Sequence, residues 1–293
     1  VNRDRIAIIP HGIPDRPLED PAAFKAGFGF DGRKVLLTFG LLSANKGIET
    51  IIEAMPAITA RHPDALYVIL GATHPHLVAQ EGEAYRDKLA ARAEALGVSA
   101  NVRFINAFVE TDMLLDYLAA ADIYVTPYLH AAQITSGTLS YAIGVGKPVV
   151  STPYWHAEEL LADDHGRLVQ FGDTAGFAAT INELLDHPEQ REAIRTRAYA
   201  RGRTMIWPRV AEMTVCELVQ SNHEKPVRLR TVPVEHGELV EPNLAAVERL
   251  TDGCGIFQHR LFLVPNPDHG YCVDDNARAF LLMHKIGGKQ AEK

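Results

Sequence analysis

Val35-Leu-Leu-Thr-Phe-Gly40-Leu-Leu-Ser-Ala-Asn-Lys46-Gly47 begins the stretch of this 293-residue chain that decides its fold. A short apolar run passes through a polar turn into an amphipathic helical pattern, and this unit recurs up to Thr152. Such runs predict strands at 34–40, 65–71, 102–105, 123–128, 148–152 and 167–171, and a strand-like run also lies at Arg5–Pro10. Strands that alternate with helices predict an α/β fold with a doubly wound parallel sheet.

The bulk composition narrows the class of protein. A net charge of −8 argues against a nucleic-acid-binding surface, and no apolar run approaches the roughly 20 residues of a membrane span. Three scattered cysteines (Cys216, Cys254 and Cys272) suit a reducing compartment, so we expect a cytoplasmic protein. The chain starts at Val1 instead of methionine and stops soon after an apolar helical pattern, so we expect a fragment of a longer protein.

Helical patterns fill the gaps between the strands. Helices are predicted at Glu49–Arg61, at Glu83–Leu96 before Gly97, and at Thr111–Ala121. From Asp173 to about Val219 the pattern is entirely helical, and residues 221–242 are predicted to be a linker with room for one strand. A different composition begins near Pro242.

Two turns after strands carry residues that suit an anion. Lys46 follows the strand at 34–40, and Gln133-Ile-Thr135-Ser-Gly-Thr138 follows the strand at 123–128 and opens a helix. Ligands of open parallel sheets bind at the carboxyl ends of the strands, and a helix start offers free N–H groups. The two turns therefore predict an anion site, most plausibly for a diphosphate. The alternatives are a solvated lysine and a helix cap without a ligand.

Five blocks in order resemble one family. Ile6-Ala-Ile-Ile-Pro-His11-Gly12-Ile13 resembles "V-I-P-N-G-V", and the run from Phe39 to Gly47 resembles "V-G-R-L-x-x-x-K-G". Further matches are Ala119-Ala-Ala-Asp122-Ile-Tyr-Val-Thr-Pro127 to "x-x-A-D-V-x-V-x-P-S", Gly146-Lys-Pro-Val-Val-Ser-Thr152 to "G-x-P-V-V-A-T", and Met205-Ile-Trp207-Pro-Arg-Val-Ala211 to "W-x-x-V-A". The chain is thus similar, over about residues 1–219, to the carboxyl-terminal half of a glycosyltransferase of family 4, which has the GT-B fold.

The resemblance implies that residues 1–220 are a Rossmann-like half-domain that binds a nucleotide-diphosphate sugar. The donor-binding positions it implies are Gly40, Lys46, Gln133, Thr135, Ser136, Gly137, Thr138 and Tyr141. Three positions depart from the family: its phosphate arginine is Leu41 here, and its two glutamates are Gln133 and Tyr141. Either donor recognition is modified, which the retained Lys46 favours, or donor binding has been lost.

The implied enzyme is a retaining hexosyltransferase of GT-B type that needs no metal and no cofactor besides its donor substrate. The sequence contains no D-x-D motif, and it does not identify the catalytic residues. The amino-terminal acceptor half of such an enzyme is missing, so this chain alone is expected to be inactive. The alternative is a non-catalytic GT-B-like binding or scaffolding module; a sugar-nucleotide epimerase would need catalytic acids that we do not find.

Residues 243–293 resemble a different family. Asp252-Gly-Cys-Gly-Ile-Phe-Gln258-His259 and His269-Gly-Tyr-Cys-Val-Asp274-Asp275-Asn276-Ala-Arg278 are similar to the start of an all-helical, six-hairpin glycosidase-like domain. The segment is predicted to be a truncated piece of that domain, because about 50 residues cannot bury such a core alone. Asp274 and Asp275 suit acid–base chemistry or sugar hydroxyls, and they equally suit a helix cap.

Overall fold

The computed structural model describes residues 6–223, 244–261 and 264–286. The chain divides into two compact units, Val1–Lys225 and Pro226–Lys293, and each is described by itself. The predicted linker at 221–242 falls almost entirely outside the described residues. In the part of the chain that the structure describes, no helix has both the length and the apolar character needed to cross a membrane.

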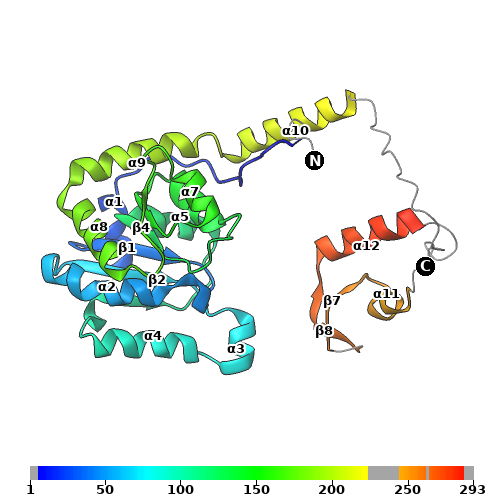
Figure 1. Cartoon of the computed structure of the whole chain (residues 1–293), viewed down its shortest axis with the longest axis horizontal. Coiled ribbons are helices and arrows are strands. Elements are labelled where there is room, and N and C mark those ends of the chain that lie inside the picture. Colours follow the sequence, from blue (N-terminus) through cyan, green and yellow to red (C-terminus); the bar gives the residue numbers. More distant parts are fainter. Residues whose placement is uncertain (1–5, 224–243, 262–263, 287–293) are drawn as a thin grey trace. The chain divides into compact units, whose positions relative to one another are not determined.

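The first unit is built on one parallel sheet (Figure 1). Its strands are β1 (Lys34–Phe39), β2 (Ala65–Leu70), β3 (Val102–Ile105), β4 (Ile123–Thr126), β5 (Val149–Ser151) and β6 (Arg167–Leu168). Their order is β3-β2-β1-β4-β5-β6, and every neighbouring pair is parallel. The chain moves outward from β1 to β3 and then crosses to β4, so the predicted doubly wound sheet is confirmed.

The strand-like run at Arg5–Pro10 was a wrong prediction for its described part. Residues 6–10 form no strand, and Ile8 is 81% exposed. The chain instead pairs at Ile13, whose N–H donates to the Met205 carbonyl and whose carbonyl accepts from the Trp207 N–H, each at 2.9 Å. An apolar run becomes a strand only where a neighbouring backbone can pair with it.

Helices cover both faces of the sheet, and several begin or end where the sequence indicates. The helices of this unit are α1 (Ala22–Lys25), α2 (Ile48–Arg61), α3 (Pro75–Glu81), α4 (Ala84–Ala95), α5 (Thr111–Ala120), α6 (Gly137–Gly144), α7 (Trp155–Leu160), α8 (Thr174–Asp186), α9 (Pro188–Gly202) and α10 (Trp207–His223). The helices predicted at 49–61, 83–96, 111–121 and 173–219 are therefore confirmed to within a few residues.

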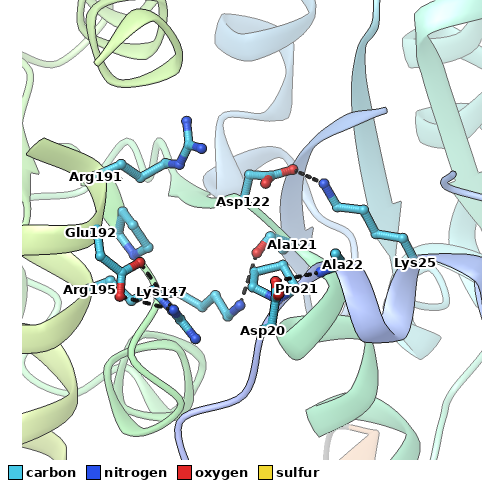
Figure 2. A pocket seen from close by; sticks show the side chains of 11 residues that line it. Asp20, Pro21, Ala22, Lys25, Ala121, Asp122, Lys147, Arg191, Glu192 and Arg195 are labelled. Atoms are coloured by element: carbon cyan, nitrogen blue, oxygen red, sulfur yellow. Dashed lines mark hydrogen bonds and ion pairs between the residues drawn. The ribbon is translucent and has the colours of Figure 1, made fainter. Parts of the chain in front are cut away.

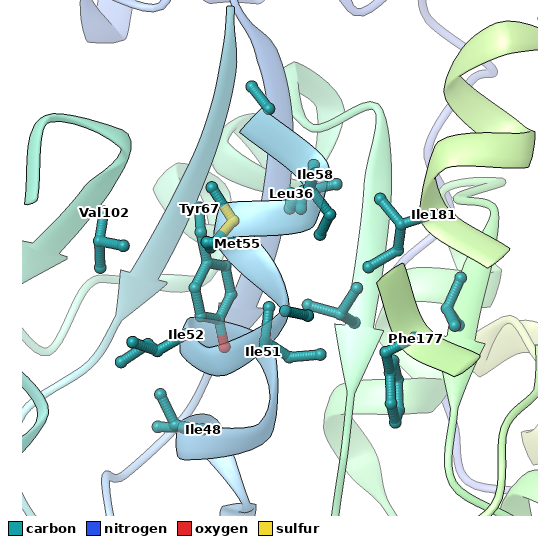
Figure 3. Packing of buried hydrophobic residues seen from close by; sticks show 14 of the residues in the cluster. Leu36, Ile48, Ile51, Ile52, Met55, Ile58, Tyr67, Val102, Phe177 and Ile181 are labelled. Atoms are coloured by element: carbon teal, nitrogen blue, oxygen red, sulfur yellow. The ribbon is translucent and has the colours of Figure 1, made fainter. Parts of the chain in front are cut away.

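Successive side chains of each buried strand point to opposite faces of the sheet, so the core forms two layers, one on each face. On one face, Ile51, Met55 and Ile58 of α2 pack with Tyr67 of the sheet and Phe177 of α8 (Figure 3). On the other face, α5, α6 and α7 cover a second cluster; its members include Leu37, Phe39, Val68, Tyr124, Val149, Leu118, Leu139, Ile143 and Leu160. Since both faces are covered, the central strands β1, β2, β4 and β5 are almost entirely buried and read as continuous apolar runs, whereas the outer strands β3 and β6 are partly exposed.

The second unit contains α11 (Ala245–Leu250), β7 (Phe257–Leu261), β8 (Val264–Tyr271) and α12 (Val273–Ile286). The prediction of a wholly helical segment is wrong here, because β7 and β8 pair as an antiparallel sheet. The rings of Phe257 and Tyr271 stack across this pair with centroids 5.0 Å apart, a cross-strand contact that favours the hairpin. Asp275 lies in the first turn of α12, where an acidic residue favours the helix.

Candidate functional site

The start of α6 lies at the carboxyl end of β4 and organises the candidate site. Ser136 is the N-cap residue: its Oγ accepts from the Leu139 N–H at 3.3 Å, and its own N–H donates to His156 Nδ1 at 2.9 Å. Helix geometry leaves the Gly137 and Thr138 N–H groups without an intrahelical acceptor. These groups, at the positive end of the helix dipole, suit an anion.

Lys46 reaches this helix start through a chain of hydroxyl groups. Its Nζ lies 2.6 Å from the Tyr128 hydroxyl and 4.2 Å from the centroid of that ring. The Tyr128 hydroxyl lies 3.0 Å from Thr138 Oγ1, which lies 3.1 Å from Ser136 Oγ. The structure therefore brings Lys46, Ser136 and Thr138 into one cluster, as the positions of the two turns predict.

Two glycines allow the turns after β1 and β4 to approach each other. Gly47 has a φ of +63°, and a Cβ there would lie only 2.0 Å from the Pro127 carbonyl oxygen. Gly40 has a φ of +121° and lies directly beside Thr138 and Lys46, where a Cβ would be 3.5 Å from Thr138 Cγ2. The backbone is further joined by the Leu129 N–H, which donates to the Asn45 carbonyl at 3.1 Å.

Gln133 and Thr135 lie on the loop that precedes α6, on the side of α7. The Gln133 amide donates to the Thr135 carbonyl at 2.7 Å, so its side chain folds back on its own loop. The N–H of His156 donates to the Gln133 carbonyl at 3.2 Å, which ties this loop to the start of α7. Thr135 and His156 also line a cavity of about 560 Å³, together with His11, Glu159 and Arg201 and apolar side chains.

His156 accepts a hydrogen bond through Nδ1, so it must be neutral at that nitrogen. Burial, helped by the nearby His11, lowers the pKa of His156, and Glu159 opposes that shift. The neutral imidazole thus accepts from the backbone N–H of Ser136, while the Oγ of the same residue caps the start of α6.

Gly137 and Tyr141 face His11 instead of the lysine cluster. A Cβ on Gly137 would lie 3.2 Å from His11 Nε2, and the rings of His11 and Tyr141 meet edge-on with centroids 6.3 Å apart. The ring of Trp207 also lies near His11, with centroids 6.4 Å apart. The eight positions expected from the sequence therefore surround one helix start, but they form three neighbouring groups.

The site offers positive charge, N–H donors and hydroxyl groups. Within the described part of the chain, Lys46 Nζ bonds to a neutral hydroxyl and forms no ion pair, so its charge is available to an anion. Among the described residues, no group of three His, Cys, Asp or Glu side chains is arranged to hold a metal ion. The arrangement fits a phosphate-bearing ligand.

A second polar cavity, of about 210 Å³, lies at the opposite edge of the sheet (Figure 2). It borders Asp122, which directly precedes β4, and Lys147, which is separated from β5 by Pro148. Its cations have protein partners: Lys25 pairs with Asp122 at 2.7 Å and Arg195 with Glu192 at 3.1 Å. Lys147 donates to the Ala119 and Ala121 carbonyls at 2.7 and 2.9 Å, at the end of α5. These contacts give the lining residues a structural role.

Sequence reasoning missed three residues of the candidate site. Tyr128 directly follows Thr126 and Pro127 at the end of β4, and that position is the signal that could have identified it. His11 lies in the block at 6–13 that resembles the family, and the resemblance gives this residue no role. His156 carries no signal, because its bond to Ser136 depends on how α7 packs against the loop before α6.

The sequence profile of the family "Glycosyl transferases group 1" matches residues 21–201, which is more than half of the chain. The chain belongs to this family. The group 1 glycosyltransferase match includes Gly40, Lys46 and the whole of α6.

Curated relatives of this group 1 glycosyltransferase chain include two mannosyltransferases. A GDP-mannose-dependent monoacylated alpha-(1-6)-phosphatidylinositol monomannoside mannosyltransferase of Corynebacterium glutamicum is 31% identical over 186 residues, 60% of this chain and 44% of the relative. A phosphatidyl-myo-inositol mannosyltransferase of Mycolicibacterium smegmatis is 28% identical over 200 residues, 68% of this chain and 48% of the relative. The chain thus spans about half the length of these relatives.

Solved structures support the fold. HepE of Anabaena, solved in complex with UDP and glucose, has a TM-score of 0.61 at 20% identity; the match covers 72% of this chain and 55% of HepE. The carboxyl-terminal domain of a group 1 glycosyltransferase, LpcC of Francisella tularensis, has a TM-score of 0.55 at 19% identity, over 66% of this chain and 97% of that domain. Over most of its length, that isolated domain shares its fold with this chain.

Proposed function

We propose that residues 1–220 are the donor-binding half of a retaining GT-B hexosyltransferase, which transfers a sugar from a nucleotide-diphosphate donor. The observation that carries the proposal is the cluster in which Lys46 Nζ lies beside the start of α6, linked to it through Tyr128 and Thr138. Family membership supports the reaction class, and the UDP in the HepE structure is a ligand of the proposed type. Retention of configuration rests on the resemblance to family 4.

The proposed chemistry is electrostatic. When the glycosidic bond to the donor breaks, negative charge develops on the departing diphosphate. A fixed ammonium and fixed backbone N–H groups stabilise such charge without having to reorganise. In our proposal Lys46 and the N–H groups of Gly137 and Thr138 supply that stabilisation.

The remaining donor-site assignments are part of the same proposal. Gln133 contacts the donor sugar through its amide, and Tyr141 contacts the ribose through its hydroxyl. Both groups are neutral, so they offer hydrogen bonds without the negative charge of the family's glutamates.

In our proposal the acceptor binds to a part of the enzyme outside this chain, which spans about half the length of its relatives. This chain alone then binds the donor without transferring its sugar. The donor needs no metal or further cofactor, and the protein acts in the cytoplasm.

Calorimetric titration of the 293-residue chain with UDP, GDP and their nucleosides tests the proposal. Lys46→Ala should weaken diphosphate binding by about 10- to 150-fold, which corresponds to a charge-assisted hydrogen bond of roughly 1.5–3 kcal/mol. Nucleoside binding should change little. The matched control is Lys88→Ala, because Lys88 is an exposed lysine of α4 whose ion pair with Glu49 is 4.0 Å long.

Two outcomes contradict the proposal. Equal losses for nucleoside and diphosphate would mean that Lys46 does not contact phosphate. A wild-type chain that binds none of the nucleotides would support the alternative of a non-catalytic binding or scaffolding module.

A further inference from the structure

Tyr128 is held rigidly between the sheet and α6, independently of Lys46. Its side chain is only 4% exposed, and its ring stacks on the buried ring of Tyr154 with centroids 5.2 Å apart. Its carbonyl accepts from the Thr152 hydroxyl at 2.6 Å, which fixes the backbone to the end of β5. The hydroxyl of Tyr128 therefore occupies a place that the fold determines.

One hydrogen bond at this hydroxyl has a defined direction. A lysine ammonium can only donate, so the Tyr128 oxygen must accept from Lys46. The same hydroxyl also bonds to Thr138 Oγ1, 3.0 Å away, and its phenolic proton is available for that bond. The hydrogen-bonded chain runs on from Thr138 to Ser136 Oγ at 3.1 Å. One phenol consequently contacts both a cation and the hydroxyl of a residue at the helix start.

A phenol suits this position better than a carboxylate would. Lysine has a flexible four-carbon stem and strong hydration, so an unheld ammonium would sample many positions. An aspartate or glutamate would hold it but would also cancel its charge. The Tyr128 hydroxyl and the face of its ring hold the ammonium and leave the positive charge uncancelled. Since Tyr128 takes one of the three ammonium N–H donors, two remain for a ligand as far as the described residues are concerned.

We propose that Tyr128 is a positioning residue for diphosphate binding, which aims Lys46 at the anion that the start of α6 receives. The inference rests on the proposed function, because it gives Lys46 the role of a phosphate ligand. Tyr128 itself makes no contact with the diphosphate. Its effect on affinity is therefore transmitted through Lys46.

Tyr128→Phe removes only the hydroxyl, because phenylalanine keeps the stack on Tyr154 and the ring face under Lys46. In the full chain, the Kd for UDP or GDP should rise about 3- to 10-fold, less than for Lys46→Ala because the ammonium itself remains. The Kd for uridine or guanosine should stay within about twofold. The matched control is Tyr67→Phe, which removes a buried hydroxyl bonded to Thr38 at 2.9 Å in the core on the other face of the sheet. It should leave all nucleotide affinities unchanged.

The double variant Lys46→Ala with Tyr128→Phe separates positioning from direct contact. If Tyr128 acts through Lys46, adding Phe to Lys46→Ala should cause no further loss of diphosphate affinity. An undiminished further loss would show that Tyr128 contacts the ligand and would overturn the inference. Two other results would also overturn it. Tighter diphosphate binding by Tyr128→Phe would mean that the phenol withdraws Lys46 from the site. An equal loss of affinity for the nucleoside would mean that the effect does not depend on the diphosphate.

The two proposals can fail separately. If Lys46→Ala weakens diphosphate binding but Tyr128→Phe leaves it unchanged, the positioning role is wrong and the donor site stands. If Lys46→Ala has no effect, or the wild-type chain binds no nucleotide, the donor site is wrong and the positioning role falls with it.

Discussion

Lys147→Met is expected to change the pH dependence of stability more than stability itself. Lys147 is 1% exposed, and its amine donates to the carbonyls of Ala119 and Ala121. Figure 2 shows the bond to Ala121. Methionine has a similar unbranched shape but cannot donate, so both buried carbonyls lose a partner, at roughly 1–3 kcal/mol each. Methionine also removes the cost of burying a charged group, and the two effects oppose each other.

The cost of burying the charged amine follows from the pKa of Lys147. Burial, followed by the charge of Arg195, lowers the pKa of Lys147 to about 7. In the unfolded chain the amine keeps its ordinary pKa near 10.5, so between these values the unfolded state binds more protons than the folded state. Stability of the wild type therefore rises with pH across this window, by up to about 1.4 kcal/mol per pH unit. From pH 7 to pH 9 the gain attributable to Lys147 is about 2 kcal/mol.

Urea unfolding of the wild type and Lys147→Met at pH 7, 8 and 9 measures this effect. Other titrating groups are common to both proteins and cancel in the difference. The methionine variant should lie within a few kcal/mol of the wild type at pH 7 and fall behind it by about 2 kcal/mol more at pH 9. A difference that does not change with pH would show that Lys147 remains charged in the folded protein, held by the carbonyl end of α5, and would refute the reasoning.

Two further substitutions test the turns and the helix of the site. Gly47→Ala should lower the free energy of unfolding by about 2 kcal/mol or more in urea titration, because it combines a positive φ with a Cβ 2.0 Å from the Pro127 carbonyl oxygen. Gly32→Ala is its control: Gly32 has a φ of +67°, and a Cβ there would meet no described residue within 4 Å besides its sequence neighbours. If Gly32→Ala costs as much as Gly47→Ala, the close approach at Gly47 is not what makes that substitution costly. Tyr141→Phe should cost about 0.5–1.5 kcal/mol of nucleotide affinity by calorimetry and leave the melting temperature unchanged. Intact affinity with a lower melting temperature would make Tyr141 a structural partner of His11.

The parallel sheet was predictable because its signals are local. Strands such as β1 and β2 are continuous apolar runs, because both faces of the sheet are covered by helices. Turn residues between them mark where each helix starts, as Gly47 does before α2. The same pattern places Lys46 and Ser136 at the carboxyl edge, since every parallel strand presents that end to one side of the sheet.

Local sequence patterns did not predict strand formation correctly where a strand depends on which other segment pairs with it. The run at 6–10 is as apolar as a strand, yet no strand forms there, and the chain pairs instead at Ile13 with the segment around Ile206. In the second unit, the hairpin of β7 and β8 carries prolines and a helix-like flank, and its pairing was not predicted. Its resemblance to a six-hairpin glycosidase-like domain stays a prediction.

Apolar periodicity, glycine placement and the order of motifs thus determined the fold, the edge of the sheet that carries the candidate site, and the identity of the lysine. Only the tertiary structure decided what holds that lysine. Lys46 and Tyr128 lie 82 positions apart in the sequence, and Ser136 and His156 lie 20 apart. Such pairs meet because separate turns pack at one sheet edge. Periodicity reports which face of an element is buried, and it carries no information about which distant side chain will lie against it.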